Sequence, residues 1–234
     1  MLEVIATSLN DALIAQKCGA DRLEIVSHPE HGGLTPDLEV VREISQAVNL
    51  PLAIMIRPHP HHFFYDDDDI QTMARDIYQF SMLGVESIVS GVLDKSGDIA
   101  QQKLEELLKA SSPCNFVFHR AIEQTPEILT SIEILSSHPI IRRVLTNYKL
   151  KDFHGELDKL NSLINSTEKL GITTVLGGGI NEETLDFLHQ NSAVKAFHVG
   201  SAVRVNGHWD ENIDPEKLTR LVSILNKNKA HDIV

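Results

Sequence analysis

The sequence predicts an α/β fold, a single (β/α)8 TIM barrel that fills residues 1–234. Short runs of apolar and β-branched residues alternate with longer segments of helical spacing, and about eight such pairs occur. Glycines follow several helical segments, directly before the next strand. An open doubly wound sheet is the structural alternative. It is disfavoured because no GxGxxG motif follows the first strand, where a dinucleotide-binding fold places its glycines.

The expected elements follow from this alternation. The predicted strands are the short runs bounded by turn residues: 2–6, 22–26, 52–57, 87–93, 116–122, 142–146, 173–176 and 196–199. The predicted helices are the segments with helical spacing between them: 10–17, 38–47, 66–83, 101–110, 126–135, 155–170, 181–189 and 215–225. Gly19, Gly84 and Gly171 suit left-handed helix C-caps. The acidic run 66–69 could hold a divalent ion, but we interpret it as a helix start, because acidic groups there favour the helix dipole.

Charge and cysteine content narrow the function classes. Lys and Arg number 21 against 33 Asp and Glu, a formal net charge of −12. Nucleic acid and anionic membranes are bound mainly through clustered cations, so neither is expected as a partner. Cys18 and Cys114 are the two cysteines of the chain and offer no disulfide framework. No apolar stretch approaches the roughly 20 residues that span a bilayer. A cytoplasmic location is expected.

Charged residues occur inside or at the ends of predicted strands. They are Glu24, Arg57, His119, Arg120 and His198. Burial of an unpaired charge costs several kcal/mol, and barrel active sites lie at the C-terminal ends of the strands. The alternative interpretation is structural: Glu24 and one arginine form an ion pair, and His198 is a hydrogen-bonded histidine of the core. We interpret the five as a candidate catalytic cluster, with Glu24 as base, His119 as acid or base and the arginines as anion clamps. Glu24 should then pair with Arg57 or Arg120.

Glycine-rich turns after the last two strands suggest an anion site. Gly177, Gly178 and Gly179 follow the seventh strand, and Gly200 and Ser201 follow the eighth. Barrels that bind phosphorylated ligands commonly hold the phosphate between these two loops, where glycine lets backbone N–H groups approach. The glycines could also serve tight turns alone. The predicted strand order favours a phosphate or sulfate site, so a small-molecule or anionic ligand is the expected partner.

Two other segments are ambiguous. His59, His61 and His62 follow the third strand and could ligate copper or zinc. We interpret them as a solvated loop, because ligands packed within four residues between prolines rarely complete a coordination sphere alone. The segment 32–36 is either an active-site lid or a turn into a helix that begins near Pro36.

Several motifs, in order along the chain, resemble the CutC family, the so-called copper homeostasis proteins. They are Glu3-Val4, GADRLE at 19–24, GGLTP at 32–36, MIRP at 55–58, FHRA at 118–121, Leu145-Thr146, GGG at 177–179 and Phe197-His198. The resemblance implies a cytoplasmic TIM barrel, a homo-oligomer and a role in copper tolerance or handling. It adds Thr146 to the candidate substrate-binding residues.

Among its departures from the family pattern, the chain lacks two cysteines. The resemblance implies cysteines after Glu3-Val4 and two residues after Glu24, and this sequence has Ile5 and Val26 there. Cu(I) favours thiolate and thioether ligands, so copper is possible here by resemblance only. Two functions stay open: copper handling, and an enzyme acting on a phosphorylated small molecule.

Overall fold

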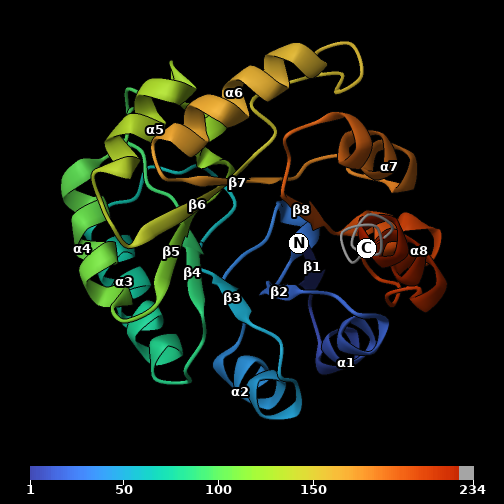
Figure 1. Cartoon of the computed structure of the whole chain (residues 1–234). Coiled ribbons are helices and arrows are strands. Elements are labelled where there is room, and N and C mark those ends of the chain that lie inside the picture. Colours follow the sequence, from blue (N-terminus) through green and yellow to red (C-terminus); the bar gives the residue numbers. More distant parts are fainter. Residues whose placement is uncertain (227–234) are drawn as a thin grey trace.

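The computed structural model describes residues 1–226 and confirms the predicted barrel. Within that range, eight parallel strands pair in sequence order, and β8 closes onto β1. Figure 1 shows the helices surrounding the strands on the outside. The predicted domain of residues 1–234 also includes 227–234, which lie outside the described residues.

The observed bounds agree closely with those expected. The strands are β1 (Leu2–Ala6), β2 (Arg22–Ile25), β3 (Leu52–Met55), β4 (Ser87–Ser90), β5 (Asn115–Phe118), β6 (Ile141–Thr146), β7 (Thr173–Leu176) and β8 (Ala196–Val199). The α-helices are α1 (Leu9–Cys18), α2 (Leu38–Ala47), α3 (Asp67–Ser81), α4 (Gln101–Ser111), α5 (Ile128–Ser136), α6 (Leu157–Lys169), α7 (Glu182–Asn191) and α8 (Pro215–Asn226). Short 3-10 helices are η1 (Pro29–His31), η2 (Arg120–Gln124), η3 (Ser201–Val203) and η4 (Val205–Gly207).

Strands β3, β4 and β5 end earlier than the sequence predicted. The N–H of Arg57 donates to the hydroxyl of Thr35 instead of to a neighbouring strand. The side chain of His119 accepts the N–H of Ala121 and so caps η2, which replaces the predicted end of the fifth strand at 119–122. At these barrel ends the local side-chain hydrogen bonds compete successfully with the sheet ladder.

Helix termini follow the expected chemistry. Asp66 accepts the N–H of Asp69, whose carboxylate accepts the N–H of Asp66, which forms a capping box at the start of α3. This confirms the acidic run as a helix start. Gly19 ends α1 with φ at 89°, in the left-handed region. None of the helices in residues 1–226 combines the length and apolarity needed to cross a bilayer.

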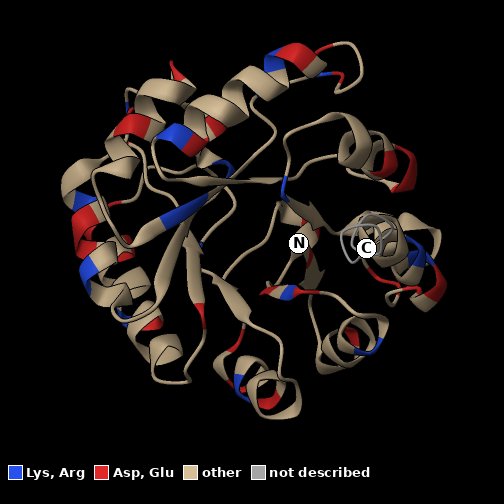
Figure 2. Cartoon of the chain, viewed as in Figure 1, with Lys and Arg blue, Asp and Glu red and all other residues tan. Residues whose placement is uncertain are grey.

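Apolar side chains form two separate clusters. The larger one lies between strands and helices, because successive strand residues face opposite sides of a sheet. The smaller one fills the barrel interior with Val26, Ala53, Met55, Val89, Val117, Leu145, Val175 and Ala196. Figure 2 shows charged residues mostly on the outer helices; arginine also occurs on β6, and a small group lies on β1 and β2. That inner group brings charge into the barrel core.

The loop after β8 is fixed by a buried ion pair. The Nη2 atom of Arg204 lies 2.7 Å from Oδ2 of Asp11 on α1, and both side chains are 2% exposed. Its Nη1 donates to the carbonyl of Glu211, and the guanidinium lies 5.1 Å from the ring centre of Trp209. Arg204 thereby attaches the 200–211 segment to the first helix of the barrel.

We expect Asp11→Asn to lower the free energy of unfolding by about 3–5 kcal/mol, because it leaves a buried guanidinium without its counter-charge. Urea unfolding measures the change. The matched control is Glu182→Gln, which removes the half-exposed partner of Arg220 and should have a much smaller effect. Equal losses in the two variants would contradict the structural role of the buried pair.

Candidate functional site

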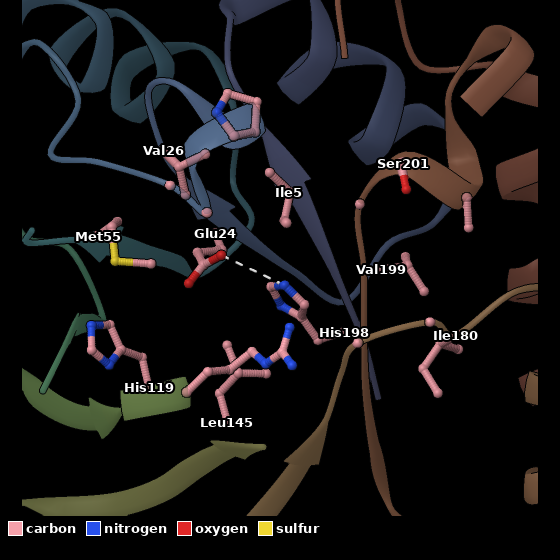
Figure 3. A pocket seen from close by; sticks show the side chains of 18 of the residues that line it. Ile5, Glu24, Val26, Met55, His119, Leu145, Ile180, His198, Val199 and Ser201 are labelled. Atoms are coloured by element: carbon pink, nitrogen blue, oxygen red, sulfur yellow. Dashed lines mark ion pairs between the residues drawn. The ribbon is translucent and has the colours of Figure 1, made fainter. Parts of the chain in front are cut away.

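A pocket of about 550 Å³ lies at the C-terminal ends of the strands (Figure 3). Its lining comes from the barrel interior and from the loops after the strands. The lining residues are Ile5, Glu24, Val26, Pro29, Gly32, Gly33, Met55, Arg57, Phe63, His119, Arg120, Leu145, Gly178, Gly179, Ile180, Asn181, His198, Val199, Gly200, Ser201, Ala202, Gly207 and Trp209. This is the face from which barrel enzymes build their active sites.

Most residues singled out from the sequence meet in this pocket. The five of the candidate catalytic cluster all line it, as do Gly178, Gly179, Gly200 and Ser201. Thr146 and Gly177 are not among the lining residues. The Thr146 hydroxyl instead accepts the N–H of Tyr148, and Gly177 packs against Leu145 and His198.

Strand register places Glu3 between His198 and Arg22. Glu3 on β1 pairs in register with His198 on one side and with Arg22 on the other. His198 Nδ1 lies 2.8 Å from Oε1 of Glu3, and its Nε2 lies 3.7 Å from Oε2 of Glu24. Arg22 Nε lies 2.7 Å from Oε2 of Glu3. The result is a buried row of alternating charge, Arg22, Glu3, His198 and Glu24.

Glu3 is the site residue that sequence reasoning missed. A usable signal was present: Glu3 precedes Ile5 by two positions, so both side chains must face the same side of β1. Ile5 faces the pocket, which makes Glu3 an interior charge.

The two carboxylates of the row differ in protonation. Burial raises the pKa of Glu24 to about 7, with a further upward contribution from Glu3, although His198 and Arg22 oppose the shift. Burial would also raise the pKa of Glu3, but the hydrogen bond from His198 and the charge of Arg22 outweigh it and lower that pKa. Burial alone would lower the pKa of His198, but Glu24 and Glu3 outweigh it and raise it. Glu24 Oε1 is buried without a hydrogen-bond partner.

The expected pairing of Glu24 with an arginine is wrong. Its ion-pair partner is His198, because both arginines lie beyond the barrel interior and have other partners. Arg120 is paired with Glu123 at 2.8 Å. The guanidinium of Arg57 donates to backbone carbonyls of the loops beside it, those of His31, Gly33 and Pro60. Arg57 therefore holds the segment after β2 in a fixed turn, and α2 begins at Leu38 after an Asp37 cap, close to Pro36 as predicted.

His119 is held as a neutral hydrogen-bond donor. Its Nδ1 accepts the N–H of Ala121 at 3.2 Å, which leaves the ring proton on Nε2. Burial, together with the charges of Arg57 and Arg120, lowers the pKa of His119 to about 3. The ring is fixed closely against Gly91, where an added Cβ would lie 2.6 Å from Nδ1. The Nε2 atom is buried without a hydrogen-bond partner.

The anion-site loops lie beside a cationic and an aromatic side chain. Gly178 and Gly179 have φ of 83° and 92°, which side-chain-bearing residues rarely adopt. A Cβ at Gly178 would lie 3.3 Å from the Arg120 guanidinium, and one at Gly200 would collide with Trp209. Glycine at both positions therefore keeps the pocket open next to a positive charge.

The residues that could hold a metal are poorly arranged for one. Within residues 1–226, no group of three or more His, Cys, Asp or Glu side chains could hold a metal ion. His59 and His62 have ring centres 4.8 Å apart, but His59 Nε2 lies 3.3 Å from an Asp69 carboxylate oxygen. The thiol of Cys114 donates to the carbonyl of Val85.

Comparison with known proteins gives one family. The sequence profile described as the CutC family matches residues 1–203. Proteins described as family protein CutC in Salmonella enteritidis and Salmonella gallinarum are each 31% identical over 204 residues, which cover 87% of this chain and 80% of each relative.

Solved structures agree in fold. A candidate copper homeostasis protein CutC from Streptococcus agalactiae superposes with a TM-score of 0.79 at 26% identity, covering 86% of this chain and 97% of that one. N-(5'-phosphoribosyl)anthranilate isomerase from Pyrococcus furiosus gives a TM-score of 0.63 at 16% identity, covering 97% and 98%. The second likeness is one of fold alone.

Glu24 should make stability depend on pH. Its pKa is raised from 4.5 to about 7 in the folded protein, so its contribution to stability is full below 4.5 and is lost as the pH rises through 7. Relative to Glu24→Gln, the wild type should lose about 3 kcal/mol of unfolding free energy between pH 4.5 and 7.5, measured by urea unfolding. Glu183→Gln, which removes an exposed carboxylate on α7, should follow the wild type. A constant difference between wild type and Glu24→Gln across this range would contradict the raised pKa.

Proposed function

The chain belongs to the CutC family, and on that premise we propose that it serves copper homeostasis, the role named in the description of its streptococcal relative. The support is the family match over residues 1–203, which include the eight strands and all the pocket-lining residues except Gly207 and Trp209. The cytoplasmic location and the homo-oligomer implied by the resemblance stay predictions.

A thiolate copper site does not fit this chain. Ile5 and Val26, which stand where the resemblance implies cysteines, both line the pocket as apolar side chains. Cys18 and Cys114 lie in separate segments, each with its thiol directed to a backbone carbonyl. Soft thiolate pairs are what Cu(I) prefers, so the proposed role does not depend on such a pair.

A second function is favoured by the pocket itself: an enzyme that acts on a phosphorylated small molecule. The observation that carries this proposal is the buried Glu24 carboxyl, whose Oε1 has no hydrogen-bond partner, in the same pocket as the Arg120 guanidinium and the glycine loops. Gly178, Gly179, Gly200 and Ser201 would bind the phosphate with Arg120, since backbone N–H groups and a guanidinium both suit an oxyanion.

Where the ligand would lie next to Glu24, away from its phosphate, the chemistry available is proton transfer. A carboxyl with a pKa of about 7 is divided between its acid and base forms at neutral pH, which suits it to general acid–base catalysis. His198, held between Glu3 and Glu24, would position that carboxyl and balance its charge.

Copper binding gives the first test. In equilibrium dialysis with Cu(I), we expect no tight stoichiometric complex, and we expect the double variant Cys18→Ser, Cys114→Ser to behave as the wild type. A tight complex that disappears in this variant would contradict the conclusion that the chain has no thiolate copper site. Weak Cu(II) binding removed by changing His59, His61 and His62 would be a separate property of the histidine loop.

Anion binding gives the second test, and Trp209 provides the signal. It is the single tryptophan of the chain and lines the pocket, so inorganic phosphate should change its fluorescence. We expect Arg120→Met to weaken phosphate binding by about tenfold, the usual magnitude for one charge-assisted hydrogen bond. Arg220→Met, which removes an exposed guanidinium on α8, is the control and should bind as the wild type. Equal binding by the two variants would exclude Arg120 from the anion site.

A further inference from the structure

We propose that the phosphorylated ligand carries a carbonyl group, whose oxygen accepts the Nε2–H of His119 while Glu24 removes and returns the proton on the adjacent carbon. The inference rests on the proposed phosphate site and adds to it the class of substrate and of reaction. The pocket would bind phosphorylated aldehydes or ketones and form their enolates.

The first step of the argument is the unused donor of His119. The hydrogen bond from the Ala121 N–H occupies Nδ1, so Nε2 carries the ring proton. The residue is 3% exposed, lines the pocket, and has no partner for Nε2. A buried N–H without a partner is costly, and a ligand oxygen in the pocket would satisfy it.

The second step is the unused acceptor of Glu24. Its Oε2 faces His198 at 3.7 Å, whereas Oε1 has no hydrogen-bond partner and the residue is 2% exposed. Figure 3 shows Glu24 and His119 among the side chains that face the pocket, with Met55 and Leu145 near them. Apolar neighbours exclude water, which strengthens the interactions of both polar groups with a ligand.

The third step is that the two groups are complementary. A carboxylate base with a neutral imidazole donor is a combination used by enzymes that take a proton from carbon next to a carbonyl. The positive charges of Arg57 and Arg120 favour the neutral form of His119, and that form donates through Nε2. Arg120 also stands beside Gly178, so the phosphate and the carbonyl would be held by different residues.

The proposed step is balanced without a further reactant. The Glu24 carboxylate takes the proton of the C–H bond, and the bonding pair forms a carbon–carbon double bond. The carbonyl π pair moves onto oxygen, where the His119 Nε2–H stabilises the charge. Return of the proton from Glu24 to carbon reverses these movements, so no oxidant or reductant is required.

The test uses 2-phosphoglycolate, whose carboxylate imitates the enolate oxygen, and inorganic phosphate as the reference anion. By calorimetry at pH 7, the full chain should bind 2-phosphoglycolate at least about tenfold more tightly than phosphate. His119→Asn keeps an acceptor for the Ala121 N–H but lacks the Nε2 donor, and it should lose this preference. His119→Gln places an amide N–H near Nε2 and should retain most of it.

Glu24 has its own readout in the same experiment. The ligand carboxylate would enter beside Glu24, which should take up a proton as it binds, so the heat should vary with the ionisation enthalpy of the buffer. Glu24→Gln should reduce this variation to the part that comes from titration of the ligand phosphate, whose second pKa is about 6.

The outcomes separate the two proposals. If inorganic phosphate does not bind at all, the phosphate site is wrong. If phosphate binds but 2-phosphoglycolate binds no more tightly, or if His119→Asn keeps the preference, the carbonyl inference is wrong and the anion site stands. Thermal unfolding of each variant excludes loss of fold, and retention by His119→Gln distinguishes a lost donor from a damaged pocket.

Discussion

The structure depends on compensation of charge inside the barrel. Arg22, Glu3, His198 and Glu24 occupy a space that barrels usually fill with branched apolar residues, and each is nearly inaccessible to solvent. Arg22 also contacts Glu86, which pairs with Arg143, so the row continues to partly exposed residues at the N-terminal end of the strands. A buried charge is tolerated only beside its counter-charge. Glu3 and His198 meet only through the pairing of β1 with β8. The charges of the row are therefore compensated only when the barrel is closed.

The same row divides the work between two glutamates. Glu3 is surrounded by Arg22 and His198 and is held ionised, whereas Glu24 is left at the pocket end with His198 as its ion-pair partner at 3.7 Å. Identical side chains thus acquire different acidities from their positions along one line. The Glu24 carboxyl is the group that can exchange protons, and the Glu3 carboxylate fixes the His198 imidazole that faces Glu24. The acidity of Glu24 therefore depends on the pairing of β1 with β2 and β8, which places Glu3 and His198 in the same row.

The fold was predictable because periodicity and helix punctuation agree along the whole chain, from the cap at Gly19 to the Asn181 cap of α7. The position of the pocket was also predictable, because barrel active sites lie at the C-terminal ends of the strands. The charge partners of Arg57 and Arg120 could not be predicted from the sequence. Both residues lie where strands give way to loops, and their partners are loop carbonyls and Glu123. The tautomer of His119 depends on one backbone N–H in a 3-10 turn that the strand pattern did not predict.

Closure of the barrel between β1 and β8 also sets the order in which a growing chain can assemble its pocket. His198 is synthesised 195 residues after its partner Glu3. Contacts so distant in sequence carry a large loop-closure cost and form late. Until β8 appears, a nascent chain has a glutamate without its imidazole and an open sheet edge on β1, a state in which association with other chains competes with folding. For this molecule, β8 closes the barrel, and the segment after it adds Gly200, Ser201 and Trp209 to the pocket, so the barrel and the pocket are both completed late in synthesis.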